Sequence, residues 1–364
     1  MKILHVLKSK IFSGAENVAT SIIRNMPSDV ESVYLTASGP IETKLLDFGI
    51  NYIAVDEVTV DEIKKAIEKV QPDIIHAHDF GCGLMCAKST NDIPIVSHLH
   101  SNPGWIRKID PRSITYGGVC KNFVKILTVS EAVEKEAWFK DKMKGKTLCV
   151  GNPFSAKKVF EKGYLAGTEL NDEKKNSFKS DLLYVGRLTP EKNPLEFIHI
   201  VDEVRRNVPQ VKAIMVGNGE LGSKCIKLIE KLGLHDNIKM VGFQANPYNY
   251  MNYSKVVVMP SKYEGFGLVA LESMTFSKPV LGSKVGGLQT IVNENCGYIC
   301  GDDKQPVDRA LFSKHAIELL TNQATYEAKS ACARKRAKEY DNFETYMNSV
   351  YSIYKEILGI HEEK

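Results

Sequence analysis

A strand, a glycine turn and a helix follow one another between residues 255 and 279. The apolar run Val256–Met259 has the length and the β-branched content of a buried parallel strand. Gly265 and Gly267 then allow a sharp turn, and apolar residues recur at helical spacing from Leu268 onward. A helix that begins there presents free backbone N–H groups and the positive end of its dipole. The stretch therefore predicts an α/β fold with an anion site, above all for phosphate, at this turn.

Two carboxylates flank the turn, Glu264 in the loop and Glu272 in the predicted helix. If all the residues between them were helical, they would lie roughly 12 Å apart along the axis. Glycosidases hold their two carboxyl groups about 5 Å apart when they retain the anomeric configuration and at most about 9.5 Å apart when they invert it. The pair is therefore expected to bind two ends of one ligand rather than to attack one bond.

The Glu264–Glu272 pair, with seven residues between, resembles the signature of the family-4 glycosyltransferases, which are retaining enzymes of the GT-B fold. In that family the second glutamate holds the donor ribose and the first contacts the donor sugar, so the resemblance implies these roles for Glu272 and Glu264. A bare pair at this spacing would suggest two solvent-facing carboxylates, but the preceding strand and the two glycines favour the family pattern. The resemblance also implies donor contacts for the loop residues Gly265, Phe266, Gly267 and Leu268.

Further motifs in the second half of the chain fit the same family. A strand ends at Gly186-Arg187, and Glu191-Lys192-Asn193 follows, where the family has Gly-Arg and then Glu-Lys. Arg187 and Lys192 would supply the two cations that a diphosphate leaving group demands, although each could instead belong to a solvated face. The loops that resemble those around the nucleotide base contain Gly217, Asn218 and Phe243.

The first half opens with an apolar strand and the loop Ser13-Gly14-Ala15-Glu16. A dinucleotide fingerprint needs three spaced glycines in this turn, and only Gly14 is present, which disfavours a dehydrogenase. The loop instead resembles the family's Gly-Gly-Ala-Glu loop, whose backbone approaches the donor diphosphate. Ser13 replaces the first glycine of that loop, and an ordinary helix entry remains the alternative.

Several later strands end in histidine or serine. Ligands of open parallel sheets sit outside the carboxyl ends of the strands, which places His78, His100 and Ser130 on the correct side. In the family a histidine after an apolar strand contacts the donor sugar or lies near the reaction centre, and His100 stands at that position. His98 would project to the same face of the strand and stays open as the functional residue. For His76 and His78, a role as core histidines is favoured.

The resemblance to GT-B enzymes, which spans nearly the whole chain, implies two Rossmann-like domains with parallel sheets facing across a cleft. Residues 1–155 would form the acceptor-side domain and residues 156–342 the donor domain. As in GT-B enzymes, a C-terminal helix, about 343–364, would cross back to the first domain. Residues 157–180 are polar with little periodicity, which indicates a linker or an exposed excursion.

Composition restricts the class of protein. The chain has 364 residues, 43% of them hydrophobic and 25% charged, as in soluble globular proteins. The net charge of +4 argues against a nucleic-acid partner. We find no leader segment, no membrane-spanning run and no zinc-finger cysteine spacing, which predicts a cytoplasmic protein with reduced thiols. No Asp-x-Asp stands at a strand end, and Asp302-Asp303 lies in a hydrophilic loop, so no metal site is predicted.

The resemblance implies retaining transfer of a sugar from a nucleoside-diphosphate sugar to an acceptor hydroxyl, in polysaccharide or glycolipid assembly. A UDP-sugar is favoured over a GDP-sugar, and no separate cofactor is expected. The alternatives are a GT-B-fold nucleotide-sugar epimerase and a non-catalytic nucleotide-sugar binding protein.

One segment suggests how the acceptor arrives. Residues 101–146 hold ten Lys and Arg against five Asp and Glu, a net charge of +5. Trp105 to Ile109 places apolar and basic residues side by side, as in surfaces that dip into anionic bilayers. We therefore predict peripheral contact with the inner membrane face and a glycan or lipid-linked acceptor. The alternative is a solvated basic surface with Trp105 in the core.

Overall fold

Along the first strand, β1 (Lys2–Val6), side chains alternate between two covered faces of a sheet. Ile3 and His5 point to one face, Leu4 and Val6 to the other, and all four are fully buried. Burial on both faces is the mark of a parallel sheet with helices on each side.

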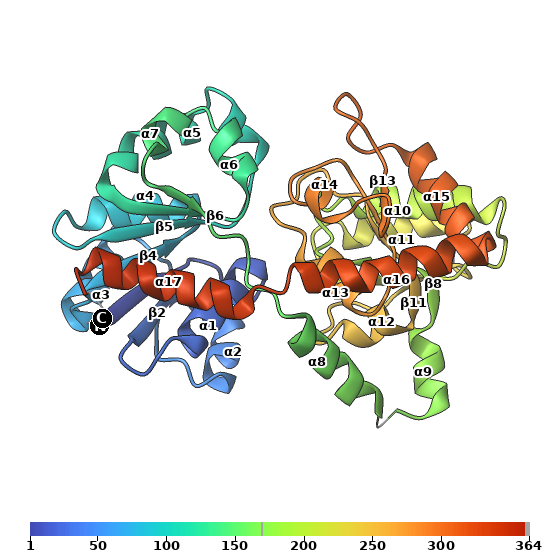
Figure 1. Cartoon of the computed structure of the whole chain (residues 1–364), viewed down its shortest axis with the longest axis horizontal. Helices are drawn as coiled ribbons and strands as arrows, with labels where there is room; N and C mark the ends of the chain where they lie inside the picture. Colours follow the sequence, from blue (N-terminus) through green and yellow to red (C-terminus); the bar gives the residue numbers. More distant parts are fainter. Residues whose placement is uncertain (169, 361–364) are drawn as a thin grey trace. The chain divides into compact units, whose positions relative to one another are not determined.

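The structure is a computed structural model that describes residues 1–168 and 170–360, and it divides into two compact units (Figure 1). Unit 1 joins Met1–Pro153 to the segment that begins at Asn342, and unit 2 is Phe154–Asp341.

Unit 1 is built on a seven-stranded sheet whose described pairings are all parallel, in the order β3-β2-β1-β4-β5-β6-β7. The strand order therefore reverses between β1 and β4. The other strands are β2 (Glu31–Ala37), β3 (Tyr52–Val55), β4 (Ile74–His78), β5 (Ile95–Leu99), β6 (Phe123–Thr128) and β7 (Thr147–Cys149).

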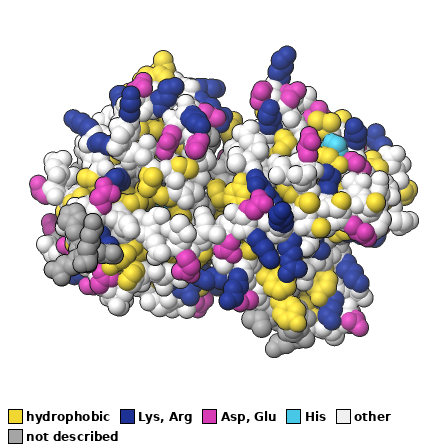
Figure 2. Space-filling view, in the orientation of Figure 1, with side chains coloured by type: hydrophobic (Ala, Val, Ile, Leu, Met, Phe, Trp, Pro, Cys, Tyr) yellow, Lys and Arg dark blue, Asp and Glu magenta, His cyan; other side chains and the backbone are white. Residues whose placement is uncertain are grey.

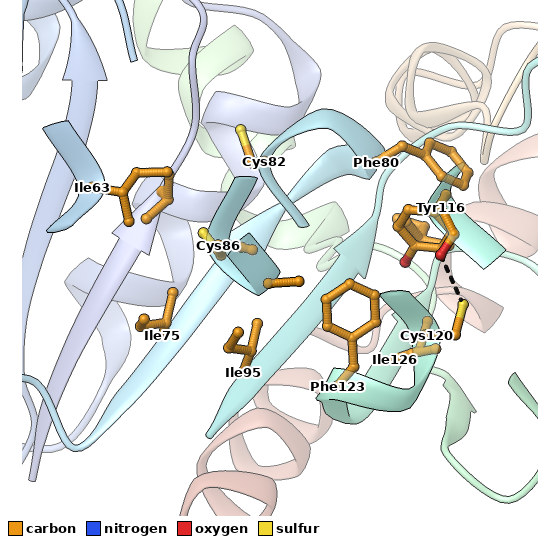
Figure 3. Packing of buried hydrophobic residues seen from close by; sticks show 14 of the residues in the cluster. Ile63, Ile75, Phe80, Cys82, Cys86, Ile95, Tyr116, Cys120, Phe123 and Ile126 are labelled. Atoms are coloured by element: carbon orange, nitrogen blue, oxygen red, sulfur yellow. Dashed lines mark hydrogen bonds between the residues drawn. The ribbon is translucent and has the colours of Figure 1, made fainter. Parts of the chain in front are cut away.

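Different helices cover the two faces of this sheet. Ile3 and its neighbours on that face pack against α1 (Gly14–Asn25), α2 (Ile41–Asp47) and α17 (Phe343–Ile357). On the opposite face, Ile75, Ile95 and Phe123 meet side chains of the second helix group (Figure 3). That group is α3 (Val60–Val70), α4 (Asp79–Ser89) and α5 (Pro111–Val119), with the shorter α6 (Glu131–Glu136), α7 (Lys140–Met143), η1 (Gly104–Arg107) and η2 (Cys120–Asn122) nearby.

Unit 2 has a six-stranded sheet, again with parallel pairings, in the order β10-β9-β8-β11-β12-β13. The order reverses between β8 and β11. The strands are β8 (Ser180–Val185), β9 (Ala213–Val216), β10 (Ile238–Met240), β11 (Ser254–Met259), β12 (Val280–Gly282) and β13 (Gly297–Ile299).

Helices again lie on both faces of this second sheet. The core on one face includes α10 (Pro194–Arg205), α11 (Gly222–Lys231) and α15 (Arg309–Thr321). The core on the other face includes α8 (Ala156–Thr168), α9 (Asp172–Phe178), α12 (Tyr248–Tyr253), α13 (Leu268–Thr275), α14 (Leu288–Ile291) and α16 (Gln323–Glu339). Two doubly wound parallel sheets were predicted from the sequence, and the fold class is confirmed.

Residues 157–180 were predicted as a linker or an exposed excursion, and the linker is wrong in the described residues. This stretch forms α8 and α9 and then enters β8. Val159 of α8 and Phe178 of α9 are buried in the core of unit 2, while Lys157 and Lys158 are exposed. Each helix buries so few apolar residues that its periodicity is hidden among the exposed lysines. The unit boundary lies after Pro153, where the sequence analysis placed it after residue 155, and the predicted extension of the last helix over 361–364 lies outside the described residues.

In the basic segment 101–146, the apolar side chains are divided between the core and the surface. Trp105 stacks edge-on against Phe80 with 4.8 Å between ring centroids, and Ile106 is fully buried. These two apolar side chains therefore belong to the core, and the exposed apolar side chains of the segment include Ile109 and Trp138. Acidic and basic side chains intermix over the face in view (Figure 2).

Two further findings bear on the compositional arguments. All eight cysteines are unpaired thiols. Within residues 1–168 and 170–360, no helix combines the length and apolar character that crossing a membrane requires.

Candidate functional site

The reversals of strand order define where a ligand is expected in each sheet. Ligands of open α/β sheets bind beyond the carboxyl ends of the strands, where neighbouring crossovers diverge. In unit 2 the two strands at the reversal are β8 and β11. The loops that leave them carry Gly186 to Asn193 and Pro260 to Gly267. Most predicted donor residues lie on these two loops.

An ion pair joins the two loops. Lys192 Nζ lies 2.6 Å from Glu264 Oε2, and the two side chains are 25% and 11% exposed. Backbone contacts hold the loops beside this pair, because the N–H of Lys262 donates to the carbonyl of Glu191 at 2.7 Å and the side-chain amide of Asn193 donates to Pro260 at 3.1 Å. A cation and a carboxylate, far apart in the sequence, are thus fixed together at the reversal.

Glycines allow the surrounding loops to touch backbone to backbone. A Cβ on Gly217, whose φ is +137°, would lie 1.9 Å from the carbonyl oxygen of Gly186. A Cβ on Gly286, whose φ is +47°, would lie 1.7 Å from the carbonyl oxygen of Glu264. Any larger residue at these positions would push the loop away from its neighbour.

The helix that follows the ion pair is α13, capped by Gly267 in the left-handed conformation at φ +102°. The first turn of α13 directly follows the loop that carries Glu264, and Gly265 in this loop accepts a backbone hydrogen bond from Gly287 at 3.0 Å. Phe266 and Leu268 are half-buried and pack against the core. The turn therefore has the strand, glycine and helix order that the sequence predicted, with a helix N-terminus beside Glu264.

Glu272 lies on α13 and has a different partner from Glu264. The Tyr248 hydroxyl donates to Glu272 Oε1 at 3.4 Å. Burial raises the pKa of Glu272 to about 7, although the Tyr248 hydrogen bond acts in the opposite direction. The two carboxylates therefore do not share a proton as an acid/base pair would, and Glu272 is close to half-ionised at neutral pH.

Three other predicted donor residues of unit 2 are solvent-exposed in this structure. Arg187 directly follows Gly186, and Asn218 directly follows Gly217, so both stand at the carboxyl edge of the sheet. Phe243 is 61% exposed after β10. All three side chains are accessible at the edge where the ion pair lies.

In unit 1 the strands at the reversal are β1 and β4, and Gly14 is the first residue of the helix after β1. A Cβ on Gly14 would meet nothing within 4 Å, so protein packing does not require glycine there. Ser13 and Glu16 form a capping box, in which the Ser13 N–H donates to Glu16 Oε2 at 2.9 Å. Glu16 is 2% exposed, so this carboxylate caps the helix.

The predicted histidine lies in a buried cluster. His100 directly follows β5, and its Nε2 lies 2.8 Å from Nδ1 of His78, with a hydrogen bond between them. Burial lowers the pKa of His100 to about 3, so the ring is neutral at pH 7. His98 is fully buried one layer deeper on the same face, with 4.0 Å between its ring centroid and that of His100. His100 is thus the histidine nearer the carboxyl edge, and Ser130 stands at the N-terminus of α6 after β6.

Sequence reasoning missed several residues of these arrangements. Tyr248 and His5 belong to no recognisable sequence motif, because their contacts with Glu272 and His78 exist only in the folded chain. Glu16 could have been recognised as a helix cap, since serine followed three residues later by glutamate is the capping-box pattern. In the sequence, Gly286 and Gly287 indicate only a glycine turn, whereas in the structure they lie directly against residues 264–266.

Comparisons with known proteins agree with this arrangement. Residues 12–146 match a family model described as Glycosyltransferase Family 4, and residues 168–338 match one described as Glycosyl transferases group 1. An uncharacterized glycosyltransferase of Methanocaldococcus jannaschii is 27% identical over 275 residues, which are 70% of this chain and 65% of that protein. The Anabaena protein HepE, solved in complex with UDP-glucose, superposes with a TM-score of 0.83 at 20% identity, covering 98% of this chain and 100% of that one. The chain is a glycosyltransferase with the GT-B fold.

A relative with a fully described reaction is the Escherichia coli UDP-Gal:alpha-D-GlcNAc-diphosphoundecaprenol alpha-1,3-galactosyltransferase. The E. coli protein is 26% identical to this chain over 330 residues, which are 82% of this chain and 84% of the E. coli protein. The sequence prediction of a glycosyltransferase is confirmed. The comparisons do not favour the alternatives of an epimerase or a non-catalytic binding protein.

Proposed function

We propose that the protein transfers a sugar from a nucleoside-diphosphate sugar to an acceptor hydroxyl, with retention at the anomeric carbon. The observation that carries this proposal is the Lys192–Glu264 ion pair at the strand reversal of unit 2, beside the N-terminus of α13. A cation and a free helix N-terminus suit a diphosphate, and a carboxylate suits sugar hydroxyls. The UDP-glucose complex of HepE and the UDP-galactose donor of the E. coli relative support a UDP-sugar in preference to a GDP-sugar.

The roles of the residues follow from charge and position. Arg187 and Lys192, with the backbone at Gly14, would stabilise the departing diphosphate, which is electrostatic catalysis and requires no metal. Glu264 would contact the donor sugar and Glu272 the ribose hydroxyls. The leaving phosphate would take the acceptor proton, since the two carboxylates have separate partners and neither stands ready as a base for the other.

The neutral ring of His100 would contact the donor sugar as a hydrogen-bonding group. Gly186, Gly217, Asn218 and Phe243 would line the nucleotide, mostly through backbone groups.

For the acceptor we propose a glycan, linked to a lipid, as in the E. coli relative. Peripheral contact with an anionic membrane on its cytoplasmic side would then rest on the exposed Ile109, Ile114 and Trp138 and on the lysines around them. Co-sedimentation with anionic vesicles tests this contact separately from catalysis. Binding at low salt that survives an Ile109→Ser/Trp138→Ser change would contradict it.

The decisive experiment incubates the protein with UDP-, GDP- and ADP-sugars and measures release of free nucleoside diphosphate. Lys192→Ala should lower turnover on the order of 100-fold, because one preorganised charge contact to the leaving group is lost. Lys231→Ala is the matched control, since this exposed lysine ends α11 at the opposite end from the carboxyl edge. EDTA should leave the wild-type rate unchanged. Equal rates in Lys192→Ala and Lys231→Ala would contradict the diphosphate role.

A further inference from the structure

Unit 1 contains five clustered histidines, His100 half-buried and the other four fully buried, that form two hydrogen-bonded layers. In one layer, His5 Nδ1 lies 3.1 Å from His78 Nε2, and His78 Nδ1 lies 2.8 Å from His100 Nε2. In the other layer, the Tyr354 hydroxyl lies 2.5 Å from His76 Nδ1, and His76 Nε2 lies 3.2 Å from His98 Nδ1. Each layer is thus a chain of three groups that crosses neighbouring elements of the fold.

The sheet geometry explains this layering. Histidines two residues apart on one strand project to the same face, as His76 and His78 do on β4. Their rings stack with centroids 4.3 Å apart and an interplanar angle of 13°. The bonds across strands are offset from the backbone register: His5 is paired with His76 in the ladder, yet its ring bonds to His78. The rings therefore bond within a layer and stack between layers.

A neutral imidazole has one N–H and one acceptor nitrogen, so the protons in each chain must all point the same way. If His5 donates to His78, then His78 donates to His100, and the remaining N–H of His100 is on Nδ1. If the order is reversed, His100 Nδ1 is a bare acceptor and His5 Nε2 carries the N–H. His5 Nε2 and His100 Nδ1 are both buried atoms without a hydrogen-bond partner in the described residues, as the ends of such a chain should be.

We propose that His5 and His78 are positioning residues, and that the chain His5–His78–His100 sets which nitrogen of His100 carries the proton. The unpartnered Nδ1 of His100 is then a donor or an acceptor according to the position of the proton on His5, two hydrogen bonds away. The importance of the His100 tautomer for catalysis rests on the proposed function, in which His100 contacts the donor sugar. The coupling of tautomers along the chain does not depend on the proposed function.

The same residues raise the question of a metal ion, because ring nitrogens of His78, His98 and His100 lie within 4.8 Å of one another. Coordination needs three lone pairs that converge on one point at about 2.0–2.1 Å. Here His78 Nδ1 and His100 Nε2 face each other at 2.8 Å, and the ring of His98 is tilted by 31° against that of His100. Two nitrogens that face each other at this distance point at one another and not at a shared third point, so the hydrogen-bonded chain accounts for the geometry better than an ion does.

The test is ¹⁵N NMR of the whole protein labelled at histidine, in which the shifts of the two ring nitrogens report the tautomer. His5→Leu removes the far end of one chain, and Tyr354→Phe removes the far end of the other. We expect His5→Leu to change the tautomer signal of His100 and leave that of His98 unchanged, and Tyr354→Phe to do the reverse. His5→Asn places an amide near the former Nδ1 and should restore the His100 signal, which a merely structural effect of removing His5 would not do.

Activity is measured on the same variants with the preferred donor. Outer partners that fix the orientation and tautomer of a functional histidine typically matter by roughly 10- to 100-fold. We expect a loss of this size in kcat for His5→Leu with little change in KM, and recovery in His5→Asn. A changed His100 signal with unchanged activity would contradict the role of His100 in transfer and leave the coupling standing.

Three results would overturn the coupling. The first is a His100 signal that does not respond to His5→Leu in a protein whose circular dichroism is native. The second is an equal response of His98 and His100 to both variants, which would indicate a general loosening. The third is stoichiometric binding of Zn²⁺ or Co²⁺ that displaces ring protons, which would make the cluster a metal site.

Discussion

At the scale of single residues, two glutamates eight positions apart have opposite electrostatic environments. Glu264 lies against the cation of Lys192 at 2.6 Å, whereas Glu272 has a tyrosine hydroxyl as its partner. Burial raises the pKa of Glu272 to about 7, well above the ordinary value for glutamic acid. The carboxylate form accepts hydrogen bonds from ribose hydroxyls more strongly than the neutral acid does.

Donor binding should therefore depend on pH through Glu272. Below pH 7 the group is mostly protonated and above it mostly ionised, so KM for the donor should fall as the pH rises through about 7. Glu272→Gln should flatten this dependence at a high KM, which steady-state kinetics from pH 5.5 to about 8.5 would show. In Tyr248→Phe the transition should move to higher pH, because the hydroxyl that lowers the pKa is lost.

Glu264→Gln is the companion variant. It should slow transfer while retaining the pH transition and nearly full affinity for the nucleoside diphosphate, because its proposed partner is the sugar. A flat pH profile in the wild type, or the same transition in Glu272→Gln, would contradict the assignment.

At the scale of elements, the loops at the carboxyl edge of unit 2 can lie close together only because glycine has no side chain. Gly286 has φ +47°, and a side chain there would overlap the carbonyl of Glu264. Gly233, at the end of α11, has a similar φ of +61°, but a Cβ on this residue would meet nothing within 4 Å. An alanine would therefore be strained by the positive φ at both positions, but only at Gly286 would its Cβ also collide with a neighbouring residue.

This difference gives a controlled prediction. Gly286→Ala and Gly233→Ala should each lower the free energy of unfolding by about 1 kcal/mol because alanine is strained at positive φ, and Gly286→Ala should lower it further because its Cβ overlaps the Glu264 carbonyl. Only Gly286→Ala should also reduce kcat/KM, on the order of 100-fold, since it displaces the backbone that carries Glu264. Comparable activity of the two variants would show that the close approach of these loops does not matter for transfer.

The elements also show what the sequence can and cannot predict. Buried parallel strands and the turn at 264–267 were predictable, because β-branched runs and glycines act locally. Tyr248, His5 and the core position of Trp105 were not, because each depends on a neighbour more than 20 residues away in the sequence. The helices α8 and α9 were missed because exposed charged residues surround their few buried apolar side chains.

At the scale of the whole molecule, the two units respond to acid in opposite directions. Burial lowers the pKa of His5 and of His100 to about 3, so the native ring stays neutral while the unfolded chain takes up a proton near pH 6.5. Unit 1 therefore loses stability as the pH falls below 6.5 toward 3. Glu272 behaves conversely, because its native pKa of about 7 lies above the unfolded value, so unit 2 gains stability as the pH falls from 7 toward 4.5.

Acidification should therefore unfold unit 1 first. At pH 5 each of His5 and His100 should cost about 2 kcal/mol relative to neutral pH. Both tryptophans, Trp105 and Trp138, lie in unit 1, so tryptophan fluorescence, excited where tyrosine does not absorb, reports that unit alone. Urea titrations followed by fluorescence should show a midpoint that falls between pH 7 and pH 5, and His5→Leu should make the fall shallower. A midpoint independent of pH would contradict the burial of neutral histidines.

The position of α17 has a consequence for the order in which the protein can be completed. This helix fills the face of the first sheet with Val350 and Tyr354, both fully buried, and Tyr354 closes one histidine layer. Unit 2 is continuous in the chain and lies between the two parts of unit 1. During synthesis unit 2 has all its strands and helices before α17 emerges from the ribosome. Unit 1 therefore begins synthesis first and is completed last, and until then Ile3, Ile74 and Val96 lack the part of their cover that α17 provides, a state on which chaperones would act.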